Sequence, residues 1–127
     1  MTVWLSRQFV LAIHYEQLAE HGGALGVRDD GLLDSALARP LNRAGYGEPD
    51  TAELAALYAI AIARNPPFVD GNKRTAFAAL VTFLDLNGLS FTPAEVDATL
   101  TMLKLAAGEI SDDEFTEWVR ANAIVPE

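Results

Sequence analysis

The sequence predicts an all-α protein, a compact bundle of about six helices with one buried central helix. Apolar residues recur at helical spacing along most of the chain, and capping residues with glycine or proline stops bracket these segments. Only the brief segment 89–91 has the character of a strand. At 127 residues, without a linker, the chain is expected to form a single domain over residues 1–127.

Two helices are predicted in the first third of the chain. The first covers residues 6–21 and ends at a glycine pair that begins at Gly22. The second starts at the capping residue Asp29, and we expect Pro40 to end it, because proline lacks a backbone N–H and clashes with the preceding turn. The segment 41–49, rich in glycine and proline, predicts an exposed loop or a short hairpin.

Two apolar helices should form the core. An alanine-rich helix begins at Asp50 or Thr51 and stops before Pro66. The next helix, over residues 75–86, carries apolar side chains on every side of the helical wheel and ends at Asn87. A helix of this kind is expected to be buried on all faces.

Two further helices complete the prediction. Thr92 and Pro93 give a cap and a first-turn proline, which indicate a fifth helix over residues 93–107. Ser111 repeats the capping pattern and indicates a sixth helix over residues 112–122.

Composition excludes several classes of partner. A net charge of −9 disfavours broad binding to nucleic acid or to anionic membranes, because most of the surface would repel phosphates. No apolar run reaches the roughly 18 residues of a membrane span, and no signal-type segment opens the chain. Cysteine is absent, which excludes disulfides and thiolate metal sites and suits a cytoplasmic location.

Positive charge is scarce and concentrated. Three of the nine basic residues, Arg64, Lys73 and Arg74, flank one loop. This concentration favours a small anionic ligand over a polymer. Ion pairs with the many carboxylates are the alternative.

The loop itself reads Asn-Pro-Pro-Phe-Val-Asp-Gly-Asn-Lys-Arg-Thr over residues 65–75, directly before a predicted core helix. The first N–H groups of a helix lack internal partners, so phosphate oxygens are natural ligands there. Gly71 would let the backbone approach closely, Asn72 would donate an amide proton, and Lys73 and Arg74 would supply charge.

Two other residues of this segment have predicted roles. Asp70 is a hard oxygen ligand suited to Mg²⁺, which typically takes one or two carboxylates together with phosphates and water. Phe68 would anchor the loop to the core. The alternative for each residue alone is an ordinary turn, cap or solvated surface position.

The segment resembles the signature of the Fic/Doc family, commonly HxFx(D/E)xNKR in its Doc branch, and matches it at Phe68, Asp70, Asn72, Lys73 and Arg74. The resemblance continues through residues 22–40 and covers nearly the whole chain. It implies a mainly helical fold and a toxin of a toxin–antitoxin module. Such toxins transfer the γ-phosphoryl group of ATP to a threonine of elongation factor Tu.

Most other Fic proteins transfer AMP and carry the pattern HxFx(D/E)GNGRxxR. Here Lys73 replaces the glycine of that pattern and Phe77 replaces its second arginine, which favours the Doc mode. The resemblance implies ATP and Mg²⁺ as cofactors and elongation factor Tu as target. The chain lacks the family's [ST]xxxE[GN] inhibitory motif, so an antitoxin would act in trans.

The catalytic histidine of the family is replaced by Pro66, which has no lone pair to accept a proton. We therefore expect little or no transferase activity. His14 and His21, on the first helix, are expected to be surface or capping residues. Pro66 has two explanations, a naturally degenerate member or a detoxifying mutation.

Two alternative functions remain open. The chain would be a nucleotide- or antitoxin-binding module without activity, or an AMP transferase of the wider family. The segment 41–49 is interpreted as the family's flap, with Tyr46 as a substrate contact or a packing lid. Arg64 would meet a phosphate or a partner carboxylate, or else serve only as a cation at a helix end.

Overall fold

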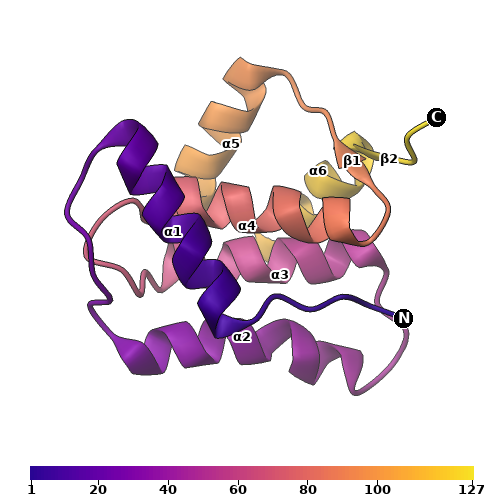
Figure 1. Ribbon diagram of the computed structural model, residues 1–127. Helices are drawn as coiled ribbons and strands as arrows, with labels where there is room; N and C mark the ends of the chain where they lie inside the picture. The colour runs from indigo at the N-terminus through magenta and orange to yellow at the C-terminus, as the bar shows by residue number, and fades with distance from the viewer.

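The computed structural model describes all residues from 1 to 127 and contains six helices and two very short strands (Figure 1). The all-α prediction is confirmed. The elements in chain order are α1 (Arg7–His21), α2 (Asp30–Ala44), α3 (Thr51–Arg64), α4 (Asn72–Leu86), β1 (Ser90–Phe91), α5 (Glu95–Ala107), α6 (Asp112–Asn122) and β2 (Ala123–Ile124). The strands pair antiparallel, with Ser90 opposite Ile124 and Phe91 opposite Ala123.

The centre of the bundle is the antiparallel pair α3 and α4, with α1 and α2 on one side and α5 and α6 on the other (Figure 1). Ten of the fourteen residues of α3 are buried. Alanine at six positions of α3 lets the neighbouring helices approach it closely. None of the six helices combines the length and the apolar composition that a membrane span requires.

Helix α4 is less buried than the sequence predicts. Its inner face is buried, but Phe77 and Val81 are only half-buried and Leu86 is exposed. The expectation of burial on all faces is therefore wrong, because α5 covers only part of the outer face of α4. Apolar residues all around the helical wheel predict that a helix has low polarity on every side. They do not predict how many other helices pack against it.

The predicted end of the second helix is also wrong, because α2 continues through the buried Pro40 to Ala44. An interior proline removes one backbone hydrogen bond, and here the last turn is held from outside the helix. The Nε of Arg43 donates to Glu53 of α3 at 2.7 Å, and its guanidinium also donates to the Tyr46 carbonyl.

The segment 41–49 consequently forms the last turn of α2 and a short connection, not a hairpin. It lies at the opposite end of α2 and α3 from the loop that joins α3 to α4 (Figure 1). The flap interpretation of this segment is wrong. Tyr46 is exposed and its ring lies 4.9 Å from the guanidinium carbon of Arg43.

The helix starts follow the predicted caps more closely. Side-chain oxygens of Ser6, Asp29, Asp50 and Ser111 each accept a backbone N–H in the first turn of α1, α2, α3 and α6. Helix α5 is the exception. It starts at Glu95 after Ala94, without a side-chain cap.

Candidate anion-binding site at the start of helix α4

The motif loop, residues 65–71, leads from α3 into α4 and depends on one glycine. Gly71 is the N-cap of α4 and has φ 74°, in the left-handed region. A Cβ at this position would lie 2.8 Å from Cδ2 of Leu18 on α1. Only glycine combines this backbone conformation with so close an approach.

Asn72 closes the loop on itself. The backbone N–H of Phe68 donates to Oδ1 of Asn72, and Nδ2 of Asn72 donates to the carbonyl of Phe68, both at 3.0 Å. One amide hydrogen of Asn72 remains for a ligand. The structure thus assigns this side chain first to the shape of the loop.

Beneath the loop lies a buried histidine. The ring of Phe68 is 1% exposed and stacks on His14 of α1, with centroids 3.8 Å apart and an interplanar angle of 8°. Nε2 of His14 lies 2.9 Å from the Asp70 carbonyl oxygen, and His14 is only 3% exposed. The expectation that His14 is a surface or capping residue is wrong. It supports the motif loop from below.

A second segment, residues 22–29 between α1 and α2, runs along the motif loop. The Val69 N–H donates to the Gly26 carbonyl at 3.0 Å, and the N–H groups of Arg28 and Asp29 both donate to the Pro67 carbonyl. Val27 and Phe68 form an isolated antiparallel bridge. Sequence reasoning missed this wall of the site. The available signal in the sequence was the series of glycines at 22, 23 and 26. The first two of these form the glycine pair that was predicted to end the first helix.

The carboxylate of Asp70 joins both segments. Its oxygens accept the N–H of Gly71 at 2.8 Å and that of Ala24 at 3.3 Å. These hydrogen bonds, with a smaller contribution from the charge of Arg74, hold the pKa of Asp70 below its ordinary value. The carboxylate is therefore ionised at neutral pH.

Asp70 would hold Mg²⁺ only together with ligands that come from outside the protein. The structure contains no group of three or more histidine, cysteine or carboxylate side chains that could hold a metal ion. A single ionised carboxylate suits a Mg²⁺ ion whose other ligands are phosphates and water. Asp70 would be the protein's ligand to such an ion.

The two cations of the motif stand at the start of α4 without a carboxylate partner. Arg74 donates to the Gly22 carbonyl at 3.2 Å, and Lys73 is exposed. Neither forms a salt bridge, whereas Arg7, Arg39, Arg43, Arg64 and Arg120 each do. No side chain caps α4, so its first N–H groups also remain for a ligand.

Arg64 takes no part in this site. Its Nε donates to the Leu105 carbonyl at 3.3 Å, and its guanidinium contacts Asp112 and the Ile110 carbonyl. These contacts hold α3 to the junction of α5 and α6. Of the two expected roles, the structure supports the structural one and not the phosphate or partner contact.

No proton acceptor stands at position 66. Pro66 is half-buried, and its carbonyl accepts a hydrogen bond from the Arg28 guanidinium. His14 is buried beneath Phe68 with Nε2 occupied. His21 is exposed at the end of α1. It lines a groove together with Arg74.

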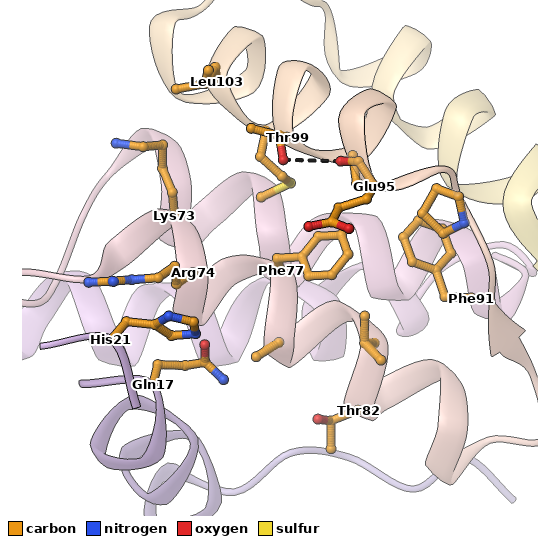
Figure 2. A pocket seen from close by; sticks show the side chains of 15 residues that line it. Gln17, His21, Lys73, Arg74, Phe77, Thr82, Phe91, Glu95, Thr99 and Leu103 are labelled. Carbon is orange, nitrogen blue, oxygen red and sulfur yellow. Dashed lines mark hydrogen bonds between the residues drawn. The ribbon is translucent and has the colours of Figure 1, made fainter. Parts of the chain in front are cut away.

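This groove, of about 750 Å³, lies between the end of α1, the outer face of α4, and α5 (Figure 2). Lys73, Arg74 and His21 are at one end, and Phe77 lies farther along α4 towards Glu95 of α5. Sequence reasoning did not find the groove. The regular spacing of Lys73, Phe77 and Val81 on one helix face was the available signal.

The fold and the motif loop define a helical protein of the Fic type, and comparison with known proteins gives the family. Residues 4–84 match the model of the "Fic/DOC family". Over 92 residues the chain is 47% identical to "Toxin Doc" of Mycolicibacterium smegmatis, covering 70% of this chain and 68% of that protein. Over 117 residues it is 33% identical to "Protein kinase doc" of Escherichia phage P1, covering 91% and 92% respectively. The chain belongs to the Fic/DOC family, in its Doc-type branch.

Proposed function

We propose that this chain is the toxin component of a toxin–antitoxin module, with a nucleotide site that is retained and a proton acceptor that is missing. The observation that carries the proposal is the pair Lys73 and Arg74, left without carboxylate partners beside the uncapped start of α4. The relatives named "Toxin Doc" and "Protein kinase doc" support a phosphate-transferring ancestry. The proposed reaction moves the γ-phosphoryl group of ATP to a threonine of elongation factor Tu.

Each residue of the site has a role in this proposal. Lys73, Arg74 and the free N–H groups of α4 bind and neutralise phosphate oxygens. Asp70 would be the ligand to Mg²⁺, which when bound supplies charge neutralisation between phosphates. Phe68 and Asn72 hold the loop that presents these groups.

Transfer also requires a destination for the proton of the acceptor hydroxyl. Pro66 provides none, and the buried His14 already uses Nε2 within the protein. Loss of a general base typically lowers a rate by about 10²- to 10⁴-fold. We therefore propose that the chain binds nucleotide but transfers phosphate poorly. AMP transfer is disfavoured, because Phe77 gives the groove an apolar ring where that branch has a phosphate-binding arginine.

The test is transfer of label from γ-labelled ATP to elongation factor Tu by the chain, by Pro66→His and by Pro66→Ala. We expect Pro66→His to transfer about 10² times faster or more, because it restores a base. Pro66→Ala relaxes the backbone without supplying a base and should not gain activity. Robust transfer by the unaltered chain would contradict the proposal. Label from α-labelled ATP on the target would support AMP transfer instead.

A second candidate function is antitoxin binding without catalysis, and one surface favours it. Val96, Leu100 and Leu103 of α5 recur at helical spacing and are 71%, 52% and 49% exposed. An exposed apolar stripe of this kind on a small protein is typical of a protein-binding surface. Leu100→Glu should weaken capture of the cognate antitoxin while leaving ATP binding unchanged. If Leu100→Glu changes neither, the stripe is not the antitoxin surface.

A further inference from the structure

We propose that His14 of α1 is a positioning residue for Asp70. By holding the backbone carbonyl of Asp70, it fixes the orientation in which the carboxylate of Asp70 is presented to Mg²⁺. The inference rests on the proposed nucleotide-dependent function and extends its site to a buried residue of another helix. It makes the binding of the metal depend on a side chain that never touches the metal.

The imidazole of His14 is held in a defined orientation. It is 3% exposed and stacks almost flat on Phe68, with centroids 3.8 Å apart and an interplanar angle of 8°. Its Nε2 lies 2.9 Å from the Asp70 carbonyl oxygen. A carbonyl oxygen can only accept a hydrogen bond, so Nε2 carries the proton and donates. The stack fixes the plane of the ring, and the hydrogen bond ties this plane to the backbone of Asp70.

The hydrogen bond from His14 acts on the peptide group between Asp70 and Gly71. This peptide is trans, because the chain contains no cis peptide bond, so its C=O and N–H point in opposite directions. The C=O accepts from His14, and the N–H donates to Oδ1 of the Asp70 carboxylate at 2.8 Å. Fixing the carbonyl therefore also fixes the N–H that holds the carboxylate.

Gly71 makes this peptide easy to turn. Its φ is 74°, and glycine adopts positive and negative φ about equally readily. A turned peptide would direct its N–H away from the carboxylate of Asp70. The N–H of Ala24, at 3.3 Å, would then be the remaining donor to this carboxylate. Donation from His14 selects the orientation in which both N–H groups hold Asp70.

The test separates the donor of His14 from its ring. His14→Phe keeps an aromatic ring on Phe68 and removes the Nε2 donor, whereas His14→Gln removes the ring and keeps an N–H donor. Val10→Ala, at a fully buried position one turn earlier on α1, is the control for a loss of stability alone. Thermal unfolding of each variant checks the fold.

The first readout requires no ligand. Amide hydrogen exchange of Gly71, followed by NMR, reports whether its N–H remains hydrogen-bonded, and Gly108 at the end of α5 is the internal reference. We expect exchange at Gly71 to be about tenfold faster in His14→Phe, and close to that of the unaltered chain in His14→Gln and Val10→Ala. Unchanged exchange at Gly71 in His14→Phe would overturn the inference.

The second readout is the gain in ATP affinity that Mg²⁺ confers, measured by calorimetry with Mg²⁺ and with EDTA. Removal of a partner behind a metal ligand typically lowers metal affinity about 10- to 100-fold. We expect His14→Phe to lower the gain about tenfold and His14→Gln to lower it by less. Asp70→Asn removes the metal ligand itself, so His14→Phe should lower the gain no further in that background.

A merely structural role of His14 gives a different pattern. It would weaken ATP equally with Mg²⁺ and with EDTA, or lower the gain further in the Asp70→Asn background. Either result would overturn the inference, and so would equal losses in His14→Gln and His14→Phe. Failure of the unaltered chain to bind ATP under both conditions would instead overturn the proposed function. Exchange at Gly71 would still decide whether His14 sets the peptide.

Discussion

The start of α4 and the start of α6 use positive charge in opposite ways. At α6, Asp112 accepts from both Arg64 and Arg39, so two arginines from different helices are neutralised in one place. At α4, Lys73 and Arg74 have no carboxylate within salt-bridge distance. Carboxylates outnumber basic residues 18 to 9 in this chain, so most cations could find a partner. Two other basic residues, Arg28 and Lys104, also form no salt bridge. Lys73 and Arg74 differ from them because they are adjacent and stand at the uncapped start of α4, where the proposed phosphate site lies.

Two glycines, Gly71 at the start of α4 and Gly108 at the end of α5, extend the comparison. Gly71→Ala should lower the free energy of unfolding more than any other substitution proposed below. Gly71 and Gly108 have φ of 74° and 73°, but an added Cβ would clash with Leu18 only at Gly71. We expect Gly108→Ala to cost about 1 kcal/mol from backbone strain alone. Gly71→Ala should cost about 3 kcal/mol, because steric overlap is added. Urea unfolding measures both, and equal losses would contradict the close approach of α1 and α4.

Arg64→Ala separates the structural arginine from the site. The substitution removes one donor from each of the Leu105 and Ile110 carbonyls and leaves Asp112 paired with Arg39 alone. We expect a loss of about 2 kcal/mol in the free energy of unfolding. Affinity for ATP, measured below the unfolding temperature, should be unchanged. A selective loss of ATP binding with normal stability would return Arg64 to the phosphate site.

Arg74→Gln should show the reverse pattern. The guanidinium donates only to the Gly22 carbonyl, so its removal should change stability by less than about 1 kcal/mol. Affinity for ATP and for tripolyphosphate should both fall about tenfold or more, because a charge-assisted hydrogen bond is lost. Calorimetry and urea unfolding on the same sample give the two readings. A large loss of stability with normal binding would contradict the assignment.

The smallest expected effect concerns the ion pair of Asp50 and Arg120, which joins α3 to α6. A side-chain hydrogen bond from Arg120 lowers the pKa of Asp50, so the folded state binds this proton less readily than the unfolded chain. The pair therefore stabilises the fold above a pH of about 4, and the contribution is lost as pH falls through the lowered pKa. Both side chains are substantially exposed, which limits the effect to about 0.5–1 kcal/mol.

Asp50→Asn isolates this charge, because asparagine also caps helices well. We expect the variant to be less stable than the unaltered chain at pH 7, and the difference to shrink as pH falls below about 4 and through the lowered pKa of Asp50, by urea unfolding across this range. A difference that stays constant as pH falls would assign the effect to capping and not to charge.

Local signals predicted the helices because caps and stops act within a few residues. Asp29, Asp50 and Ser111 cap as expected. Pro40 failed as a stop because contacts of Arg43 with Glu53 and Tyr46 hold the following turn, and one of these partners lies on another helix. Such support depends on tertiary packing, which spacing along the chain does not reveal.

Only part of the site was predicted, because spacing along the chain does not reveal tertiary packing here either. The motif loop and its cations follow from consecutive residues, whereas His14 and the segment 22–29 reach it from more than 35 residues away in sequence. Their contribution arises from the packing of α1 on α4. A histidine on a half-apolar helix carries no sign that it will stack beneath a phenylalanine of a distant loop.

The most direct test of the central claim is a calorimetric titration of ATP and Mg²⁺ into the unaltered chain and into Pro66→His, with γ-phosphate transfer measured on the same preparations. A retained phosphate site without a base predicts equal dissociation constants and transfer that differs by about 10²-fold or more. Absence of ATP binding in the unaltered chain, or equal transfer by both proteins, would contradict it.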